Sequence, residues 1–373
     1  IVFGRGEINR LPKLCEGLGT HFLVVTGASS AQKSGVLSRL TDGLEAVGKQ
    51  VTHFDGVSSE PTPKVVDAAV RAGRGAGVDA VIGIGGGSVM DTAKAAAGVI
   101  ANGGGVRDYL EGVGTGAKID KDPLPFIAVP TTSGTGTEVT KNAVIMSREM
   151  KFKKSMRDER LIANIALVDP ELTIGMPQDV TAASGIDAIC QLVESYTAKG
   201  ANAFCDAMSI YHIPRAVDAL KRAYDDGSDM DARETMAMAS MVSGMCLANA
   251  GLGAAHGIGA VLGAVLGVRH GIACGMLLPH VMRYNINHGV GKYAQIGKAM
   301  GCSDADDKTA SMYAAYEIGA LCKHLKMPGR LGELGVTVDM IDELAAASMG
   351  SSMSKNPVDI NNEQCAEFIT KIL

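Results

Sequence analysis

The first 170 residues alternate between short apolar runs and segments in which apolar positions recur at helical spacing. The apolar runs are short and rich in β-branched residues, which predicts buried strands at 22–26, 51–54, 79–84 and 126–129. Apolar residues three and four positions apart predict helices at 33–47, 63–76 and 91–99. Strands that alternate with helices in this way predict a doubly wound α/β domain with a parallel sheet.

After Val168-Asp169-Pro170 the pattern changes. Strand-like runs stop, and long segments rich in Ala, Met and Leu repeat their apolar positions at helical spacing. Pro177 suits the start of the first of these helices. We therefore expect an α/β domain at residues 1–175 and an all-helical domain at 176–373, with a ligand site in a cleft between them.

A glycine-rich turn, Gly85-Gly86-Gly87-Ser88, joins the predicted strand at 79–84 to the predicted helix at 91–99. A turn in this position sets free N–H groups and the positive end of a helix dipole against phosphate oxygens. A flexible turn without any ligand has the same short motif. The turn favours a nucleotide-binding site without establishing one.

A second loop, residues 130–138, is rich in hydroxyl groups and follows the predicted strand at 126–129. Ligands of open α/β sheets bind at the carboxyl ends of the strands. A threonine-rich loop alone is more often ordinary turn chemistry. Paired with the glycine turn on a neighbouring strand, the loop is a candidate cradle for the phosphates and nicotinamide ribose of a dinucleotide.

Polar residues of the second half form a candidate metal site. Asp187 and Gln191 lie four positions apart, on one face of a predicted helix. His256 and His270 both lie in a glycine-rich region. A carboxylate and two imidazoles are a suitable ligand set for one divalent ion. The alternative is that the histidines are separate buried residues with structural hydrogen bonds, because residues so distant in sequence need not converge.

Composition narrows the class of protein. The chain has 373 residues, is 46% hydrophobic and 20% charged, and is long enough for two globular domains. Its formal net charge is −5, with both signs interspersed. Because it has no long basic run, we expect neither nucleic acid nor an anionic membrane as a partner.

The cysteines are scattered without a CxxC pair, a pattern typical of free thiols in a reducing compartment. The N-terminal residues show no basic-then-apolar signal pattern, and the apolar stretches are interrupted well short of a membrane span. We therefore expect a cytoplasmic protein. The eight cysteines are Cys15, Cys190, Cys205, Cys246, Cys274, Cys302, Cys322 and Cys365.

Motifs along essentially the whole chain resemble, in the same order, those of the iron-containing (group III) alcohol dehydrogenase family. The matching segments are residues 4–12, 85–94, 130–138 with Asn142, 168–173, 185–188, 256–270, 278–285 and 356–357. The resemblance implies a dehydroquinate synthase-like architecture, in which an α/β nucleotide-binding domain precedes an all-helical metal and substrate domain. It also implies hydride transfer between NAD or NADP and a small alcohol or aldehyde, and assembly as a homodimer or larger homo-oligomer.

The resemblance implies which residues bind the cofactor. The glycine turn would hold the pyrophosphate region, the threonine loop would surround the cofactor, and Lys153 falls where the family has a nucleotide-contacting lysine. The implied cofactor-binding residues are Gly27, Ser29, Gly86, Gly87, Ser88, Asp91, Thr131, Thr132, Thr135, Asn142 and Lys153.

The resemblance also implies that Asp187, His256 and His270 bind Fe²⁺ or Zn²⁺ and act in catalysis through the ion, which polarises the substrate oxygen. Two positions depart from the family. Its second ligand is a His four residues after the Asp, and here that candidate ligand is Gln191, whose amide oxygen is a neutral and weaker donor. Many relatives have a further His near the substrate where this chain has Ala260, so no proton relay passes through that position.

A third departure concerns the choice of cofactor. Relatives that prefer NAD commonly end the first strand with an Asp that binds the ribose 2′-hydroxyl. Here that position is Gly27, followed by Ser29, Ser30 and Lys33. Without the carboxylate, a 2′-phosphate is not repelled, and the serines and the lysine offer donors to it. We expect a preference for NADP(H) over NAD(H).

Two other functions stay open. A carbon–oxygen lyase like dehydroquinate synthase shares the architecture and uses NAD only transiently, although residues 240–290 offer few basic groups for a polyanionic substrate. A non-catalytic nucleotide-binding relative would keep the cofactor loops without turnover, as Gln191 and Ala260 suggest. The substrate is not fixed by the sequence, but the small apolar residues at 247–266 favour a compact, uncharged aldehyde.

Overall fold

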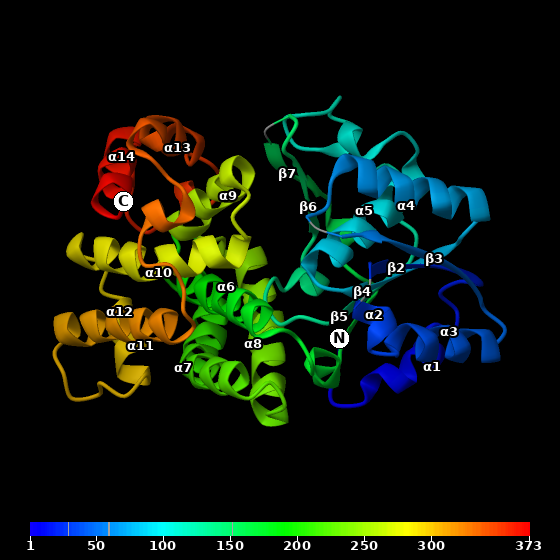
Figure 1. The fold of residues 1–373 in the computed structure, drawn as a ribbon, viewed down its shortest axis with the longest axis horizontal. Helices are drawn as coiled ribbons and strands as arrows, with labels where there is room; N and C mark the ends of the chain where they lie inside the picture. The colour runs from blue at the N-terminus through cyan, green and yellow to red at the C-terminus, as the bar shows by residue number, and fades with distance from the viewer. Residues whose placement is uncertain (29, 59, 151) are drawn as a thin grey trace. The chain divides into compact units, whose positions relative to one another are not determined.

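The computed structural model describes residues 1–28, 30–58, 60–150 and 152–373. The chain divides into two compact units (Figure 1). The first unit comprises residues 1–132 and 136–174, and the second comprises residues 133–135 and 175–373. The short segment 133–135 therefore packs with the helical unit although its neighbours in sequence belong to the first.

A six-stranded parallel sheet forms the centre of the first unit, in the order β1-β8-β5-β4-β2-β3. Its strands are β1 (Val2–Phe3), β2 (His21–Gly27), β3 (Gln50–Val57), β4 (Ala80–Gly85), β5 (Phe126–Pro130) and β8 (Ile165–Val168), and a separate antiparallel hairpin joins β6 (Asn142–Ser147) to β7 (Phe152–Arg157). β2 pairs with β3 on one side and with β4 on the other. The order of strands therefore reverses between β2 and β4, and their carboxyl ends form a switch point, where open α/β sheets bind ligands.

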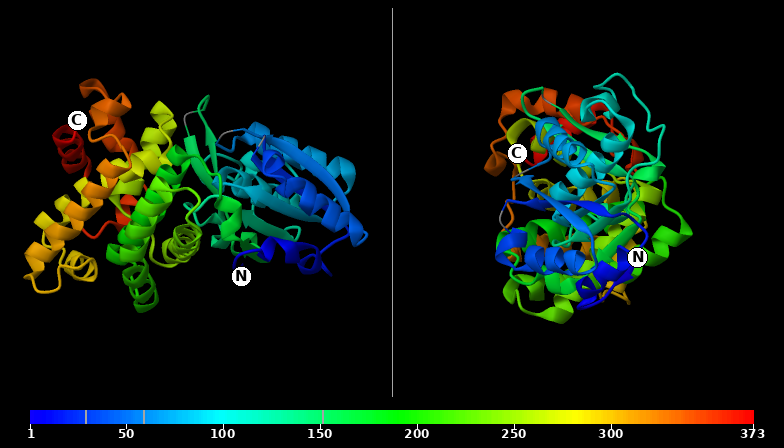
Figure 2. Two further views of the ribbon diagram at one scale, coloured as in Figure 1. Left: turned by 60° about the horizontal axis from the view of Figure 1, so that its bottom comes forward. Right: turned by 90° about the vertical axis from the view of Figure 1, so that its right-hand side faces the viewer.

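Helices cover both faces of this sheet, as Figures 1 and 2 show. They are α1 (Leu11–Leu14), α2 (Ser30–Lys33), α3 (Val36–Ala46), α4 (Pro63–Ala76) and α5 (Gly87–Asn102), with 3₁₀ turns at Glu7–Arg10, Val106–Tyr109, Thr137–Val139, Glu159–Leu161 and Pro170–Thr173. Phe22 and Val24 of β2 pack in one apolar cluster with α1 and α3, whereas Leu23 and Val25 pack in another with α4 and α5. Because both faces are covered, the strands are apolar at successive positions and not only at alternate ones.

Most predicted elements of this unit are present, with small shifts at their ends. The helix predicted at 63–76 is α4, and the predicted strands lie within β2, β3, β4 and β5 or overlap them. The helix predicted at 33–47 is α3, which begins only at Val36, because Gly35 before it has a left-handed φ of 72° and separates it from the short α2. Strands β1, β6, β7 and β8 were not predicted.

Within residues 175–373, all of which the structure describes, the regular elements are helices, as the sequence predicts. They are α6 (Gln178–Thr197), α7 (Ala203–Asp225), α8 (Met230–Ala250), α9 (Ala254–Leu266), α10 (His270–Asn287), α11 (Tyr293–Ala299), α12 (Asp307–His324), α13 (Ile341–Ala347) and α14 (Asn362–Lys371), with 3₁₀ turns at Leu331–Leu334, Val338–Met340 and Met353–Lys355. Pro177 is the N-cap of α6, so the predicted start of the first helix is confirmed.

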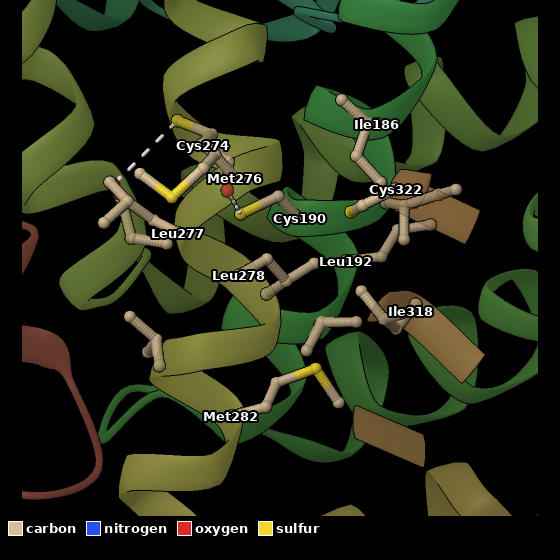
Figure 3. Close-up of a cluster of buried hydrophobic side chains, with 14 of the residues drawn as sticks. Ile186, Cys190, Leu192, Cys274, Met276, Leu277, Leu278, Met282, Ile318 and Cys322 are labelled. Atoms are coloured by element: carbon tan, nitrogen blue, oxygen red, sulfur yellow. Dashed lines mark hydrogen bonds between the residues drawn. The ribbon is translucent and has the colours of Figure 1, made fainter. Parts of the chain in front are cut away.

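One apolar core joins the helices of the second unit. Figure 3 shows part of it, with Ile186 and Leu192 from α6, Leu278 and Met282 from α10, and Ile318 from α12. Helix α6 is buried along almost its whole length, polar positions included. Any polar residue on α6 must therefore find its partners inside the protein.

Among the described residues, no single helix is both long and apolar enough to cross a membrane. Helices α8 and α9 reach the necessary length and hydropathy only as a pair, across a bend of 104°. Both contribute buried residues, such as Val242 and Ile258, to the core of the second unit, which accounts for their apolar composition.

Candidate active site

The glycine turn and the threonine loop lie side by side at the carboxyl edge of the sheet. β4 and β5 are neighbours with Gly85 in register with Pro130, and the Thr131 amide donates to the Gly85 carbonyl at 2.9 Å. Gly86 approaches Thr132 so closely that a Cβ on it would lie 3.3 Å from that side chain. The neighbouring placement of the two loops is confirmed.

Helix α5 starts directly at the glycine turn. Its N-cap is Gly86, which has no side chain to cap the first turn. The amide groups at the start of the helix, those of Gly87 and Ser88 among them, therefore have no side-chain acceptor. Together with the helix dipole, they give this edge of the sheet the character of an anion-binding site.

Asp91 and Lys94, one turn apart on α5, are bonded to the end of the threonine loop and to β6 after it. Asp91 accepts hydrogen bonds from the Thr137 hydroxyl at 2.6 Å and from the Val144 amide at 3.1 Å. Lys94 donates to the carbonyls of Thr137 at 2.7 Å and Asn142 at 3.0 Å. These contacts fix the loop against α5, so Asp91 and the backbone of Asn142 are engaged inside the protein.

Burial changes the ionisation of this cluster. It lowers the pKa of Lys94 to about 8, against the opposing charges of Asp91 and Glu138. It raises the pKa of Glu138 to about 7, with the charge of Lys94 opposing. Burial likewise raises the pKa of Asp91. The buried Lys94 ammonium group is thus the counter-charge for two buried carboxyl groups, those of Asp91 and Glu138.

The other predicted cofactor residues lie at different places. Gly27 ends β2 at the switch point of the sheet. Lys153 lies on β7, with its Nζ 3.5 Å from a carboxylate oxygen of Glu60. Thr135 is in the segment that packs with the second unit. Ser29 lies outside the described residues.

In the second unit, the structure brings Asp187, His256 and His270 together. They come from α6, from the first turn of α9 and from the start of α10. Oδ1 of Asp187 lies 3.4 Å from Nε2 of His256 and 3.8 Å from Nε2 of His270. The side chain of His270 is 25% exposed, whereas those of Asp187 and His256 are almost fully buried. The cluster therefore opens toward solvent at His270.

A close approach of α10 to α6 makes this convergence possible. At Gly271, next to His270, a Cβ would lie 1.9 Å from the carbonyl oxygen of Ala183 on α6. No other residue fits there without moving one of the helices. Glycine at this position thus sets the separation between His270 and Asp187.

Two atoms of the cluster have no hydrogen-bond partner. They are Oδ1 of Asp187 and Nε2 of His256, both buried. A buried polar atom without a partner costs about 1–3 kcal/mol. Both atoms face one another across 3.4 Å, and both are of types that bind divalent metals. The residues present therefore fit the divalent ion that the sequence motifs imply.

Glu194, which the sequence motifs did not single out, orients His256. Its Oε2 lies 2.6 Å from Nδ1 of His256, and its Oε1 accepts a hydrogen bond from the Ala255 amide at 2.7 Å. A carboxylate that accepts a hydrogen bond from Nδ1 keeps a proton on that nitrogen, so that Nε2 is the nitrogen that can bind a metal. Glu194 lies two turns after Asp187 on α6, and that spacing was the available signal.

Gln191 lies beside the cluster and is bonded at both ends of its amide. Its Nε2 donates to Oδ2 of Asp187 at 3.0 Å, and its Oε1 accepts from the Ser243 hydroxyl at 2.7 Å. The Asp187 carboxylate only accepts hydrogen bonds, so the amide nitrogen must be the end that faces it. This orientation directs the amide oxygen to Ser243.

Cys274 is the second functional candidate that the motifs missed. It follows His270 by one turn of α10, with its Sγ 3.6 Å from Nε2 of His270. Asp187, His256, His270 and Cys274 each offer a ligand atom, and these atoms all lie within 4.8 Å of one another. In the sequence, Cys274 was not distinguished from the other cysteines. Its position four residues after His270 was the available signal, because residues at that spacing lie on the same face of a helix.

Charges around this group of residues shift two pKa values. Burial alone lowers the pKa of His256, but Cys274 and Asp187 outweigh that effect and raise it well above its ordinary value, so a metal that binds Nε2 displaces a proton from it. Burial alone raises the pKa of the Cys274 thiol, but a hydrogen bond from Cys190 and the two histidines lower it well below its ordinary value. The cluster thus favours a thiolate at Cys274.

Comparison with known protein families covers both units. Residues 1–170 match the family described as iron-containing alcohol dehydrogenase, and residues 181–373 match the C-terminal domain of the Fe-containing alcohol dehydrogenase family. Among curated proteins, lactaldehyde reductase of Escherichia coli (strain K12) is 35% identical, over 98% of this chain and 96% of its own length. The NAD-dependent methanol dehydrogenase of Bacillus methanolicus is 32% identical, over 92% and 90% of the two chains.

Solved structures of similar proteins also match the chain over its whole length. A crystal structure of 1,3-propanediol oxidoreductase matches with a TM-score of 0.93 and 31% identity, covering 100% of this chain and 97% of that one. Sulfoacetaldehyde reductase from Bifidobacterium kashiwanohense, in complex with NAD⁺, matches with a TM-score of 0.90 and 29% identity, covering 100% and 96%. The two-unit architecture is therefore shared along the full length of these proteins.

Proposed function

The chain belongs to the iron-containing alcohol dehydrogenase family, and we propose that it exchanges a hydride between NADP(H) and a small alcohol–aldehyde pair at a divalent ion held by Asp187, His256 and His270. Family membership makes it a metal-dependent oxidoreductase that uses a nicotinamide cofactor. The cofactor preference, the ligand residues and the substrate range are our proposals.

The observation that carries the metal site is the pair of buried, unpartnered atoms Oδ1 of Asp187 and Nε2 of His256. His270 adds a third donor at the exposed side of the cluster, where a substrate has access. When bound, the divalent ion acts as a Lewis acid on the substrate oxygen while the nicotinamide accepts or donates the hydride.

The surrounding residues hold the ligands in place. Glu194 keeps the His256 ring in the tautomer that presents Nε2, and Gln191 keeps the Asp187 carboxylate from rotating. Ala260 offers no group for proton transfer, so the proton released when an alcohol becomes an aldehyde leaves by a route that does not pass through this position.

For the cofactor, we propose that the pyrophosphate lies against Gly86, Gly87 and Ser88 at the start of α5. The uncapped amides and the helix dipole support this placement. Thr131 and Thr132 of the adjacent loop would contact the rest of the cofactor. Lys94, with the neighbouring Asp91, supports the site indirectly, because its bonds hold the loop in position.

Three further predicted positions, Thr135, Asn142 and Lys153, are part of the proposed cofactor site, and Ser29 and Gly27 are proposed to lie at its 2′-hydroxyl end. Gly27 supports NADP over NAD, since no carboxylate ends β2 to repel a 2′-phosphate. Comparing kcat/KM with NADPH and with NADH tests this. A clear preference for NADH would reject it.

The substrate proposed is a compact, uncharged aldehyde or the corresponding alcohol. Relatives carry the names lactaldehyde reductase, NAD-dependent methanol dehydrogenase and 1,3-propanediol dehydrogenase, which all refer to small molecules. The small apolar residues at 247–266 support the same size class.

We also propose a homodimer or larger homo-oligomer, on the family resemblance, and a reducing, cytoplasmic location. All eight cysteines are free thiols, and most are buried, which fits that location. Light scattering of the purified chain measures its mass in solution, and a monomer would reject the first of these proposals.

Elemental analysis, together with NAD(P)H oxidation over a panel of small aldehydes with and without added Fe²⁺ and Zn²⁺, tests the proposed function. We expect bound metal and metal-dependent oxidation of the cofactor. A carbon–oxygen lyase would show no net change in the cofactor. A non-catalytic relative would bind the cofactor and oxidise none of it with any aldehyde.

A further inference from the structure

We propose that Cys274 is a thiolate ligand of the metal, and that Gln191 is a positioning residue and not a ligand. The proposal rests on the proposed function, because it assumes the divalent ion at Asp187, His256 and His270. It extends that function by naming a fourth ligand in a chain that has Gln191 where the family has a ligand His.

The distances within the cluster match those between ligands of one ion. Metal–ligand bonds of about 2.0–2.3 Å at tetrahedral angles place neighbouring ligand atoms about 3.3–3.8 Å apart. Oδ1 of Asp187 lies 3.4 Å from Nε2 of His256 and 3.8 Å from Nε2 of His270. Sγ of Cys274 lies 3.6 Å from Nε2 of His270. The thiol is therefore at ligand spacing from His270, and it lies within 4.8 Å of the ligand atoms of Asp187 and His256.

The hydrogen bonds of Gln191 direct its oxygen elsewhere. The amide nitrogen donates to Oδ2 of Asp187, and the oxygen accepts from Ser243. Turning the amide over would set its oxygen against the Asp187 carboxylate, and two acceptors would then face one another. Gln191 thus stabilises the orientation of Asp187 in which Oδ1 stays unpartnered.

The type of donor also favours Cys274. The cluster is buried apart from His270, and the Asp187 carboxylate and the Glu194 carboxylate on Nδ1 of His256 lie within it as negative charges. Cys274 adds a sulfur donor atom to the ligand set, whereas the neutral Gln191 amide turns its oxygen toward Ser243. A soft sulfur ligand also favours zinc over harder metals, which prefer sites made of oxygen and nitrogen donors alone.

A second thiol nearby provides a matched control. Cys190 on α6 lies next to Cys274, as Figure 3 shows, and both side chains are fully buried. Its Sγ lies 3.7 Å from Nδ1 of His256, on the ring edge that Glu194 occupies. Cys190 is thus on the opposite edge of the imidazole from the unpartnered Nε2. It resembles Cys274 in burial and chemistry but does not face the proposed ion.

The test uses Co²⁺ loaded into the full-length protein, with cobalt content measured in each sample. A thiolate ligand adds an intense sulfur-to-cobalt charge-transfer band in the near-ultraviolet. We expect this band in the wild type, in Cys190→Ser and in Gln191→Ala, and its loss in Cys274→Ser. We also expect Cys274→Ser to bind Co²⁺ at least about tenfold more weakly, since ligand-shell changes commonly cost that much.

Several results would overturn the proposal. Stoichiometric cobalt without the band in the wild type would mean that the metal site exists and Cys274 is not a ligand. Loss of the band in Cys190→Ser, with retention in Cys274→Ser, would assign the sulfur to the other thiol. A wild type that binds no cobalt or zinc would reject both this proposal and the metal site of the proposed function. If Cys274→Ser fails to fold, X-ray absorption of zinc-loaded wild type decides, by the presence or absence of one sulfur neighbour at about 2.3 Å.

Discussion

Nδ1 of His256 and Oε2 of Glu194 lie 2.6 Å apart in the buried interior of the second unit. The bond joins α9 to α6 and fixes the ring so that Nε2 faces Asp187. A carboxylate that binds the far nitrogen of a metal-binding imidazole sets its tautomer and strengthens it as a donor. The second unit therefore contains both the proposed ligands and the groups that orient them.

Replacement of Glu194 tests this orienting role. Glu194→Gln keeps an oxygen acceptor but removes the charge, so we expect weaker metal binding by about 10–100-fold. Glu194→Ala also leaves Nδ1 of His256 and the Ala255 amide without partners, so its loss of affinity should be larger. Competition with a metal chelator measures both. Wild-type affinity in the two variants would contradict the role assigned to Glu194.

The approach of α10 to α6 can be tested at Gly271. In Gly271→Ala the added Cβ would meet the Ala183 carbonyl, so we expect destabilisation of about 1–3 kcal/mol and weaker metal binding as His270 moves away from Asp187. Gly291→Ala is the control, since a Cβ there meets nothing within 4 Å. Urea denaturation of both variants gives the difference in the free energy of unfolding. Equal stability of the two would show that the helices separate without cost.

Glu138 predicts a dependence of stability on pH. Burial raises its pKa from 4.5 to about 7, so between these values the folded protein holds a proton that the unfolded chain has released. The stabilisation is complete below pH 4.5 and is lost as the pH rises through 7. At about 1.4 kcal/mol for each pH unit, the loss amounts to roughly 3 kcal/mol.

The matched variant for this effect is Glu138→Gln, which is similar in size and does not titrate. We expect its free energy of unfolding to improve relative to the wild type as the pH rises from 4.5 to 7. Denaturation with urea at several pH values across this range measures the difference. Parallel curves for the two proteins would mean that Glu138 titrates normally in the folded state.

The cofactor preference depends on charge at the end of β2. In Gly27→Asp, a carboxylate would repel a 2′-phosphate and could accept a hydrogen bond from a 2′-hydroxyl. We expect the ratio of kcat/KM for NADPH to that for NADH to fall at least about tenfold, equivalent to about 1.4 kcal/mol. Gly27→Asn is the uncharged control and should shift the ratio less. An unchanged ratio in Gly27→Asp would show that Gly27 does not lie near the ribose.

The parts of the fold that the sequence predicts well are those with local causes. β4, the glycine turn and α5 follow one another directly, and each has its own signal in the chain. The hairpin of β6 and β7 was missed because its second strand carries Lys153, Lys154 and Arg157, and its pairing is with itself rather than with the main sheet. β1 has two residues, too few for any periodicity.

The candidate site also divides into residues that have a signal in the sequence and roles that depend on packing. Asp187, His256 and His270 were identified from motif resemblance, and the structure brings them together. The parts played by Glu194 and Cys274 depend on how α6, α9 and α10 pack, which a linear pattern does not contain. The orientation of the Gln191 amide depends on Ser243 of α8, far away in sequence, so its hydrogen bonds were beyond sequence reasoning.

The most direct test of metal-dependent hydride transfer is to follow deuterium from the reduced cofactor, labelled at C4 of the nicotinamide, into the product of a small aldehyde. With Zn²⁺ or Fe²⁺ restored to chelated protein, we expect deuterium on the carbinol carbon of the alcohol. We expect none from the chelated protein or from Asp187→Asn, which should still bind the cofactor. Transfer that is equally fast with and without metal, or absent from the metal-loaded wild type for every aldehyde tested, would contradict the account.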